Sequence, residues 1–342
     1  MTHADFPRLN IAVLLPCYNE GKSIASVVIG FRQALPSARI YVYDNNSSDD
    51  TSAQAALAGA TVVPSRRQGK GNVVRQMFAD IEADIYVMAD GDGTYDPTAA
   101  PRMIDTLLAD RADMVVGTRR NVTEDAGRNG HALGNRLFNI IYRTLFGSDF
   151  TDIFSGYRAF TRRFAKSFPA SSPGFEIETE MSVHASTLRL PVSEIEFDYG
   201  RRVEGSESKL STFRDGFRIL RMMGMLMKET KPFVFFSAVS AGLFGLAALS
   251  SAPVLFEYFE TGLVTRMPTW MLSMTLLLGA MMTFTAGIIL DSLSRARIEQ
   301  KRIHYLSIAP ARGEKYFNTA GTAADRSEAD PLLAPAMRKT GG

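Results

Sequence analysis

The sequence has very little cysteine and almost no net charge. Its single cysteine, Cys17, cannot form an intrachain disulfide, and nothing else in it indicates an oxidising compartment. Its 38 Lys and Arg residues nearly balance its 36 Asp and Glu residues, which argues against nucleic acid as a partner. The amino end lacks a long apolar run, since Ile11–Leu15 is too short for the apolar region of a signal peptide, so we expect none. With 46% hydrophobic residues, the 342-residue chain is expected to fold, either as one large domain with an appendage or as two modest domains.

Charge is missing altogether from two stretches near the carboxyl end, Pro232–Phe256 and Met267–Leu290. Each is long enough for the roughly 20 apolar residues of a membrane-spanning helix. A pair of buried core helices is the alternative, but two such runs in succession favour the membrane. The loop between them holds Glu257 and Glu260 against Arg266 alone, whereas basic residues lie on the outer flanks. By the positive-inside rule we expect a protein of the inner (cytoplasmic) membrane with two spans, both long flanks in the cytoplasm and the short loop outside. The flanking basic residues are Arg218, Arg221, Lys228 and Lys231 before the spans and Arg295, Arg297, Lys301 and Arg302 after them.

Before the spans, strand-like and helix-like segments alternate. This alternation predicts an α/β fold with a mostly parallel, Rossmann-like sheet that is covered by helices on both faces. In such sheets, ligands bind beyond the carboxyl ends of the strands. The expected strands are Ile11–Leu15, Arg39–Asp44, Thr61–Val63, Ile85–Ala89 and Met114–Gly117, and the expected helices are Ser23–Ala34, Asp50–Ala58, Gly71–Ile81 and Thr98–Leu108.

Three carboxylates follow the apolar run Ile85–Ala89 in the stretch MADGDGTYDP. Asp90 and Asp92 are spaced i, i+2 between glycines, so both can direct carboxylate oxygens toward one hard cation. Mg²⁺ or Mn²⁺ takes one or two protein carboxylates and completes its coordination with phosphate oxygens and water. An ordinary polar turn is the alternative for an isolated Asp-Gly-Asp.

Polar motifs also follow the earlier strands. PCYNE begins at Pro16 and DNNSSDDT begins at Asp44, a carboxylate placed to accept hydrogen bonds from a ribose or a base. The first turn lacks the G-x-G-x-x-G fingerprint, which disfavours a nicotinamide or flavin cofactor. RRQGKGN is not a phosphate-binding P-loop, because Pro64 replaces its first glycine and Gly71 replaces the Ser or Thr after the lysine.

Together these motifs resemble the family-2 glycosyltransferases of GT-A fold, and within them the polyisoprenyl-phosphate glycosyltransferases of the dolichol-phosphate mannose synthase type. The resemblance runs from about Ile11 through Lys209 and extends to the two-span membrane tail. Asp50 departs from it, since glycine is more usual there. The matching segments, in chain order, are PCYNE, DNNSSDDT, GKGN, DGDG, DIFSGYRAF, GFEIETEM and RRVEGSESKLS.

The resemblance implies roles for individual residues. Asp90 and Asp92 match the metal positions, Lys70 matches the loop near the diphosphate, and Glu176 and Glu178 either orient the sugar hydroxyls or pair with arginines. A cation and Lys70 would stabilise the negative charge that develops on the departing nucleoside diphosphate. The implied nucleotide-sugar pocket comprises Pro16, Tyr18, Glu20, Asp44, Asn46, Lys70, Asp90, Glu176 and Glu178.

The implied acceptor is a lipid monophosphate, which is already largely dianionic at neutral pH and needs cations more than a base. Arg119, Arg136, Arg202 and Lys209 are our candidates for that clamp, because guanidinium groups bind phosphate bidentately. Asp152 matches the acceptor-side segment and is assigned to catalysis with Asp92 and Lys70. Its role as base, orienter or further metal contact stays open, and capping a turn is the alternative.

The resemblance, the two charge-free runs and the composition of the flanking segments together set the expected domain limits. A basic amphipathic segment before the spans would lie in the headgroup region, or else pack on the domain with a solvated basic face. The oligomeric state stays open, although Gly242, Gly245 and Gly279 in the spans could support helix packing between the protomers of a homo-oligomer. The expected regions are 1–210 for the glycosyltransferase domain, 211–231 for the juxtamembrane helix, 232–256 and 267–290 for the transmembrane helices, and 291–342 for a cytoplasmic tail, disordered at its end.

The sequence therefore predicts an inverting, metal-dependent glycosyltransferase. It would move a hexose from a nucleotide diphosphate sugar, with uridine diphosphate glucose or N-acetylglucosamine favoured, to a polyprenyl phosphate at the membrane. Inversion rests on the resemblance. Two alternatives stay open: a processive polysaccharide synthase, although its Q-x-x-R-W element is missing and Trp270 is the only tryptophan, and an inactive lipid-binding scaffold.

Overall fold

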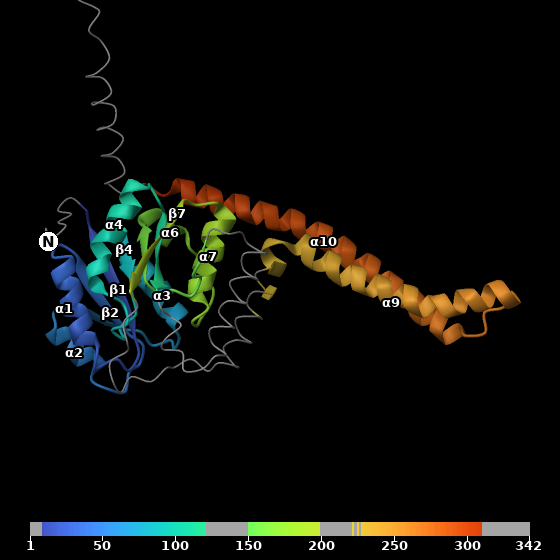
Figure 1. Ribbon diagram of the computed structural model, residues 1–342, viewed down its shortest axis with the longest axis horizontal. Coiled ribbons are helices and arrows are strands. Elements are labelled where there is room, and N and C mark those ends of the chain that lie inside the picture. The colour runs from blue at the N-terminus through green and yellow to red at the C-terminus, as the bar shows by residue number, and fades with distance from the viewer. Residues whose placement is uncertain (1–8, 121–149, 199–220, 222–223, 226, 310–342) are drawn as a thin grey trace, which may run out of the picture.

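The computed structural model describes residues 9–120, 150–198, 221, 224–225 and 227–309. These residues form an α/β domain from which two long helices project side by side (Figure 1). Of the sequence expectations, Arg136, Arg202 and Lys209 lie outside the described residues, as do most of the juxtamembrane segment and the tail beyond residue 309.

One seven-stranded sheet forms the centre of the domain, in the order β3-β2-β1-β4-β6-β5-β7. The strand pairs β3–β2, β2–β1, β1–β4 and β5–β7 are parallel, which confirms the mostly parallel sheet expected from the sequence. Only β6 runs antiparallel to both of its neighbours. The strands are β1 (Ile11–Cys17), β2 (Arg39–Asp44), β3 (Thr61–Pro64), β4 (Ile85–Met88), β5 (Met114–Arg120), β6 (Arg158–Thr161) and β7 (Val192–Asp198).

Helices cover both faces of this sheet. On α1, Ile24, Val27, Val28 and Phe31 are buried at the i, i+3, i+4, i+7 spacing of a helix with one apolar face. Helices α1, α2 and α4 bury their apolar faces in the core on one side of the sheet, and α3, α6 and α7 do so on the other. The helices of the domain are α1 (Ile24–Ala34), α2 (Thr51–Leu57), α3 (Lys70–Asp80), the 3-10 helix η1 (Pro97–Ala99), α4 (Ala100–Ala109), α6 (Arg162–Ser167) and α7 (Ile177–Leu188).

The register of the sheet brings three loops to the same edge. Cys17 pairs with Asp44 at the ends of β1 and β2, and Leu14 pairs with Met88 at the end of β4. The polar segments that follow β1, β2 and β4 therefore leave the sheet side by side. We call this the carboxyl edge.

Two long apolar helices follow the domain, α9 (Pro232–Thr261) and α10 (Met267–Ser307). By length and composition both can cross a membrane, and most of their apolar side chains are exposed. Ser240 Oγ donates a hydrogen bond of 2.8 Å to the Ala280 carbonyl, and Ser250 and Ser273 share another of 2.8 Å. Such contacts join the two helices along their length.

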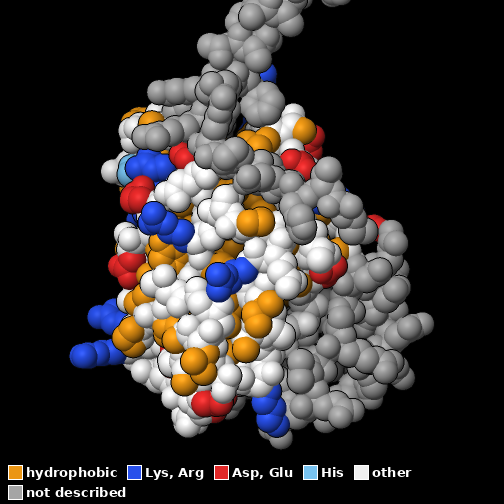
Figure 2. Space-filling model, turned by 90° about the vertical axis from the view of Figure 1, so that its left-hand side faces the viewer, with side chains coloured by type: hydrophobic (Ala, Val, Ile, Leu, Met, Phe, Trp, Pro, Cys, Tyr) orange, Lys and Arg blue, Asp and Glu red, His pale blue; other side chains and the backbone are white. Residues whose placement is uncertain are grey.

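The opposite end of the molecule has a different surface. There, on the end of the domain away from α9 and α10, hydrophobic side chains lie among charged and polar ones (Figure 2). Isolated exposed apolar residues such as Leu57 on α2 are normal for a water-facing surface. Among the described residues, most of the exposed large apolar side chains belong to α9 and α10.

Candidate active site

The loops at the carboxyl edge are fastened to one another by hydrogen bonds. Ser23 Oγ donates to the Gly91 carbonyl at 2.7 Å, which joins the start of α1 to the loop after β4. The Glu20 N–H donates to Thr51 Oγ1 at 2.8 Å, which joins the loop after β1 to α2. The three loops therefore form one preorganised surface.

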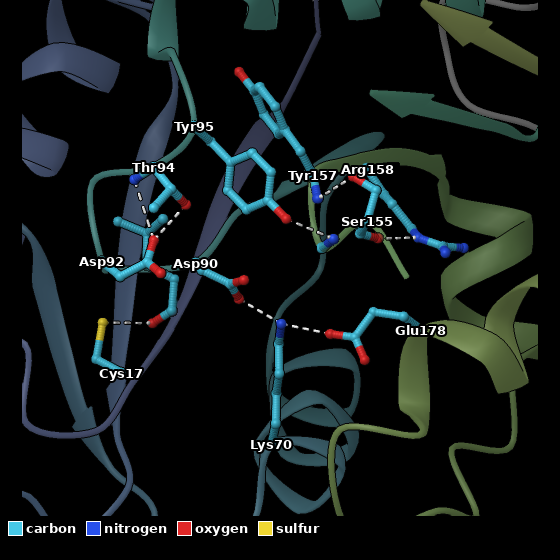
Figure 3. A network of polar contacts seen from close by, with 12 residues as sticks. Cys17, Lys70, Asp90, Asp92, Thr94, Tyr95, Ser155, Tyr157, Arg158 and Glu178 are labelled. Atoms are coloured by element: carbon cyan, nitrogen blue, oxygen red, sulfur yellow. Dashed lines mark hydrogen bonds and ion pairs between the residues drawn. The ribbon is translucent and has the colours of Figure 1, made fainter. Parts of the chain in front are cut away.

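Lys70 occupies the centre of this edge. Its ammonium group lies between two carboxylates, with an ion pair to Asp90 Oδ1 and another of 2.5 Å to Glu178 Oε1 (Figure 3). The Lys70 and Glu178 side chains are almost completely buried, whereas Asp90 is partly exposed. The three residues come from the start of α3, the loop after β4 and the first turn of α7. We call them the Lys70 cluster.

Burial and charge act against each other in the Lys70 cluster. Burial disfavours the ammonium form of Lys70, but the two carboxylates outweigh it and raise the pKa of Lys70 above its ordinary value. Burial also raises the pKa of Glu178, against the attraction of Lys70. Lys70 therefore keeps its positive charge at neutral pH, and Asp90 is the most exposed of the three side chains.

The backbone around Lys70 is fixed from two directions. The Gly69 N–H donates to Asn45 Oδ1 at 2.7 Å, and the Gly71 N–H donates to the Pro173 carbonyl at 3.1 Å. Gly69 has a φ of 120°, which only glycine adopts readily. A Cβ on Gly71 would overlap the Ser172 carbonyl oxygen. The glycines of GKGN therefore allow the segment before α7 to approach α3 closely.

That segment, residues 170–173, is held by two charged side chains. Arg75 Nε donates to the Ala170 carbonyl at 2.7 Å. Glu180 accepts the N–H groups of Ser171 and Ser172 at 2.9 and 2.7 Å. Neither Arg75 nor Glu180 was expected from the sequence as a site residue, and both lie within or beside motifs that were recognised.

Asp92 is buried beside the cluster. Its Oδ1 accepts hydrogen bonds from the Thr94 N–H at 3.1 Å and the Thr94 hydroxyl at 2.6 Å (Figure 3). Within the part of the chain that the structure describes, no group of three or more His, Cys, Asp or Glu side chains could hold a metal alone. Two aspartates nevertheless fit Mg²⁺ or Mn²⁺, which take their remaining ligands from phosphate and water.

The loop before β6 reaches the same place. The Gly156 N–H donates to the Tyr95 hydroxyl at 2.9 Å, and a Cβ on Gly156 would lie 2.9 Å from Asp90 Oδ2 and 3.0 Å from Lys70 Nζ. Asp152 lies earlier in this loop, where its Oδ1 accepts the Phe154 N–H at 3.1 Å. The structure therefore gives Asp152 the turn-capping contact that was its alternative role, and brings Gly156 to the Lys70 cluster.

Arg158 is a further residue that sequence reasoning missed. Its guanidinium is fully buried and donates to the carbonyls of Ile153 and Ser155 at 3.0 and 2.8 Å and to Ser182 Oγ at 3.0 Å. Ser182 in turn donates to the Glu178 carbonyl at 3.1 Å. Arg158 thereby connects this loop to α7. The sequence did offer a signal, since Arg158 is a charged residue at the start of the short strand β6.

Five of the predicted nucleotide-sugar residues lie at the ends of β1 and β2 or on the loops that follow them. Pro16 is the half-buried residue before the end of β1, Tyr18 is exposed, and Glu20 lies beside Gly91. Asp44 accepts hydrogen bonds from the Ser47 N–H at 3.1 Å and Ser52 Oγ at 2.6 Å, so it stabilises its own turn. Asn46 has a φ of 60° and donates to the Arg66 carbonyl at 3.0 Å.

The remaining predicted residues lie farther out. Glu176 is the N-cap residue of α7 and is half-buried. Arg119 is part of β5, and the structure describes its backbone only. Glu176 also lines a cavity of about 540 Å³ between α7, α10 and the residues that precede α9. The lining combines apolar Phe168, Val183, Met225 and Ile298, basic Arg221, Arg297 and Lys301, and acidic Glu180 and Glu229.

Comparison with known proteins finds clear relatives of this chain. The family model described as glycosyl transferase family 2 matches residues 12–168. Glycosyltransferase AglJ of Haloferax volcanii is 37% identical over 231 residues, which cover 67% of this chain and 76% of that relative. Undecaprenyl-phosphate mannosyltransferase of Micrococcus luteus is 26% identical over 220 residues, which cover 59% of this chain and 88% of that relative.

Among solved structures, glucosyl-3-phosphoglycerate synthase from Mycobacterium tuberculosis, in complex with Mn²⁺, uridine-diphosphate-glucose and phosphoglyceric acid, superimposes with a TM-score of 0.54. It is 21% identical in sequence, and the match covers 64% of this chain and 80% of that one. This similarity shows the fold.

Proposed function

Since the chain belongs to glycosyl transferase family 2, we propose that it transfers a hexose from a nucleotide diphosphate sugar to a polyprenyl phosphate at the membrane surface. The observation that carries the proposal is the Lys70 cluster, with Asp92 beside it, in a chain that also has two membrane-length helices. A nucleoside diphosphate that departs from the sugar needs a fixed cation next to it, and Lys70 is one.

The Lys70 cluster fits the charge that develops in this reaction. As the glycosidic bond to the diphosphate breaks, negative charge grows on the leaving oxygen, and a preoriented ammonium stabilises it without reorganisation. Glu178 and Asp90 hold the ammonium in place. Asp90 and Asp92 would hold Mg²⁺ or Mn²⁺, which when bound supplies further positive charge to the diphosphate.

A lipid acceptor is favoured by the cavity between α7 and α10. It lies beside the site at Glu176, and its lining combines apolar side chains with basic Arg221, Arg297 and Lys301 and acidic Glu176, Glu180 and Glu229. An anionic headgroup would bind at the basic side chains, with its apolar chain along the apolar part of the lining. Arg119, Arg136, Arg202 and Lys209 remain our proposed phosphate ligands.

For the donor we propose a uridine diphosphate sugar, glucose or N-acetylglucosamine. Mannose is the second candidate, because the Micrococcus luteus relative is described as an undecaprenyl-phosphate mannosyltransferase. The assay that decides between them incubates detergent-purified protein with Mn²⁺ or Mg²⁺, undecaprenyl phosphate and each radiolabelled nucleotide sugar in turn. Label in the organic phase from one donor identifies both the reaction and the sugar.

Asp92→Asn tests the proposed metal ligand in the same assay. It is expected to reduce transfer at least about a hundredfold, since it removes a carboxylate that would hold the cation at the diphosphate. Asp96→Asn is the matched control, because Asp96 is exposed four residues away and caps η1 with its Oδ1 at 2.8 Å from the Thr98 N–H. Asparagine caps equally well, so activity should persist. Normal turnover by Asp92→Asn would exclude this assignment, and hydrolysis of donor without lipid transfer would indicate another acceptor.

A further inference from the structure

The last part of α10 leaves the apolar region as an unbroken helix. Residues 291–307, which we call the polar half of α10, carry many charged side chains. This polar half therefore cannot lie in the hydrocarbon of a bilayer. At 1.5 Å per residue it extends about 25 Å beyond the apolar half. Figure 1 shows it running back along the domain to α6.

The end of this helix is attached to the domain by specific contacts. The Tyr305 hydroxyl donates to Asp113 Oδ2 at 2.7 Å. Arg163 of α6 donates from Nε to the Ile308 carbonyl at 3.2 Å, and its guanidinium lies 5.7 Å from the centre of the Tyr305 ring. We call Tyr305, Asp113 and Arg163 the α10 latch.

Asp113 is a rigid point of attachment. It is only 4% exposed, and its Oδ1 accepts the Thr161 hydroxyl at 2.7 Å. Its N–H donates to the Pro191 carbonyl at 2.8 Å, and its carbonyl accepts the Thr161 N–H at 3.0 Å. Asp113 therefore joins the start of β5, the end of β6 and the residue before β7. This edge of the sheet lies opposite the carboxyl edge, because Thr161 pairs with Ile85 at the start of β4.

A second contact fixes the other end of the polar half. Ser294 Oγ donates to the Glu229 carbonyl at 2.8 Å, just before α9 begins, and Ser294 is 5% exposed. The polar half of α10 is thus held near the apolar helices at Ser294 and on the domain at Tyr305. A helix that is held at both ends fixes the orientation of the domain relative to the apolar helices.

We propose that Tyr305 is a positioning residue, which fixes the distance and orientation of the catalytic domain relative to the bilayer through Asp113 and Arg163. The proposal rests on the proposed function. An acceptor phosphate that is anchored in a membrane can reach the Lys70 cluster only when the domain lies at a defined height above the bilayer. A nucleotide in solution, in contrast, can bind whatever the orientation of the domain. The latch should therefore affect transfer to lipid and leave nucleotide binding unchanged.

The test uses the full chain, reconstituted in phospholipid vesicles that contain undecaprenyl phosphate. Tyr305→Ala is compared with Tyr258→Ala, which removes the same side chain from α9 far from the domain, and with Tyr305→Phe, which keeps the ring over Arg163. Three quantities are measured: transfer of labelled sugar to lipid, affinity for uridine and guanosine diphosphates with Mn²⁺, and energy transfer from a dye on Leu57→Cys to a labelled lipid. Leu57 is 83% exposed on α2, and Cys17 is buried.

Tyr305→Ala is expected to lower lipid transfer about tenfold, as loss of a hydrogen bond to a charged group allows. It should broaden the distribution of energy-transfer distances and leave nucleotide affinity within about twofold. Tyr305→Phe should lie between this variant and wild type, and Tyr258→Ala should match wild type. An equal loss of nucleotide affinity would show a merely structural role, and unchanged transfer or unchanged distances would overturn the proposal.

The two proposals fail differently. If wild-type protein transfers no sugar to lipid from any donor, the proposed function is wrong. The energy-transfer distances still decide whether Tyr305 fixes the domain on the membrane, because that measurement needs no turnover.

Discussion

Lys70 is the residue on which the other charges of the site depend. It separates Asp90 from Glu178, and its removal would leave two carboxylates facing each other in a largely buried place. Breaking a buried ion pair by removing one partner is costly because a charge stays behind unpaired. Lys70→Met is therefore expected to lower the free energy of unfolding by about 3 kcal/mol and to abolish transfer. Denaturant unfolding and the lipid transfer assay measure the two effects.

A second substitution separates stability from chemistry at this position. The double variant Lys70→Met, Glu178→Gln removes the buried carboxylate together with its partner ammonium. Much of the stability that Lys70→Met alone loses should therefore return. Transfer should not return, since the cation next to the diphosphate is still missing. Recovery of transfer in the double variant would contradict the role proposed for Lys70.

His184 should make folding sensitive to acid. Burial, helped by the positive charge of Lys301, lowers its pKa to about 3, against about 6.5 in an unfolded chain. As the pH falls below about 6.5, the unfolded chain binds a proton that the folded protein binds only near pH 3, so stability is lost across that window. We expect the unfolding temperature of His184→Gln to depend less steeply on pH between 6.5 and 4. His304→Gln, an exposed position on α10, should retain the wild-type slope.

At the scale of elements, α3 can contact the segment before α7 because Gly71 has no side chain. Gly71→Ala would place a Cβ against the Ser172 carbonyl and push residues 170–173 away from Lys70. We expect it to lower transfer at least about tenfold, because small displacements of positioned groups are costly in catalysis. Gly242→Ala on α9 meets nothing within 4 Å and should leave transfer unchanged. Equal activity of the two variants would show that this contact is dispensable.

The amino-terminal half of the domain was largely predictable from its sequence. The strands before residue 117 and the helices between them have clear apolar periods, and the rule that loops meet at the carboxyl ends placed Asp90 near the loops after β1 and β2. The secondary structure of residues 150–198 was harder to predict from the sequence. β6 has four residues and begins with a buried arginine, so its period is too short to recognise, and its antiparallel direction depends on long-range pairing with β4 and β5.

The composition of the site was predictable to a similar degree. Lys70, Asp90 and Glu178 were each identified from motifs, but the ion pairs that unite them join three separate elements, which no local pattern encodes. Arg158 and Glu180 act by bonding to backbone groups of distant loops. Such partners become visible only once the chain has folded.

At the scale of the whole molecule, we propose an orientation of the two apolar helices across a membrane from the charges that flank them. We expect the loop between α9 and α10 to lie outside and the polar half of α10 in the cytoplasm. Cysteines introduced at two exposed positions, Glu260 and Gln300, test this with a membrane-impermeant maleimide. In intact cells Glu260→Cys should be labelled, and Gln300→Cys should be labelled only after permeabilisation. The reverse pattern would contradict the predicted orientation.

The return of α10 to the domain changes how the membrane part should be regarded. Because Tyr305 and Ile308 contact Asp113 and Arg163, the chain leaves the domain, passes through α9 and the apolar half of α10, and comes back. Topologically, the apolar hairpin is an insertion within the domain rather than an extension of its end. A truncation before Pro232 would therefore also discard a packed helix of the soluble part. A water-soluble version is better built by replacing residues 232–290 with a short linker, which keeps residues 291–308 in place.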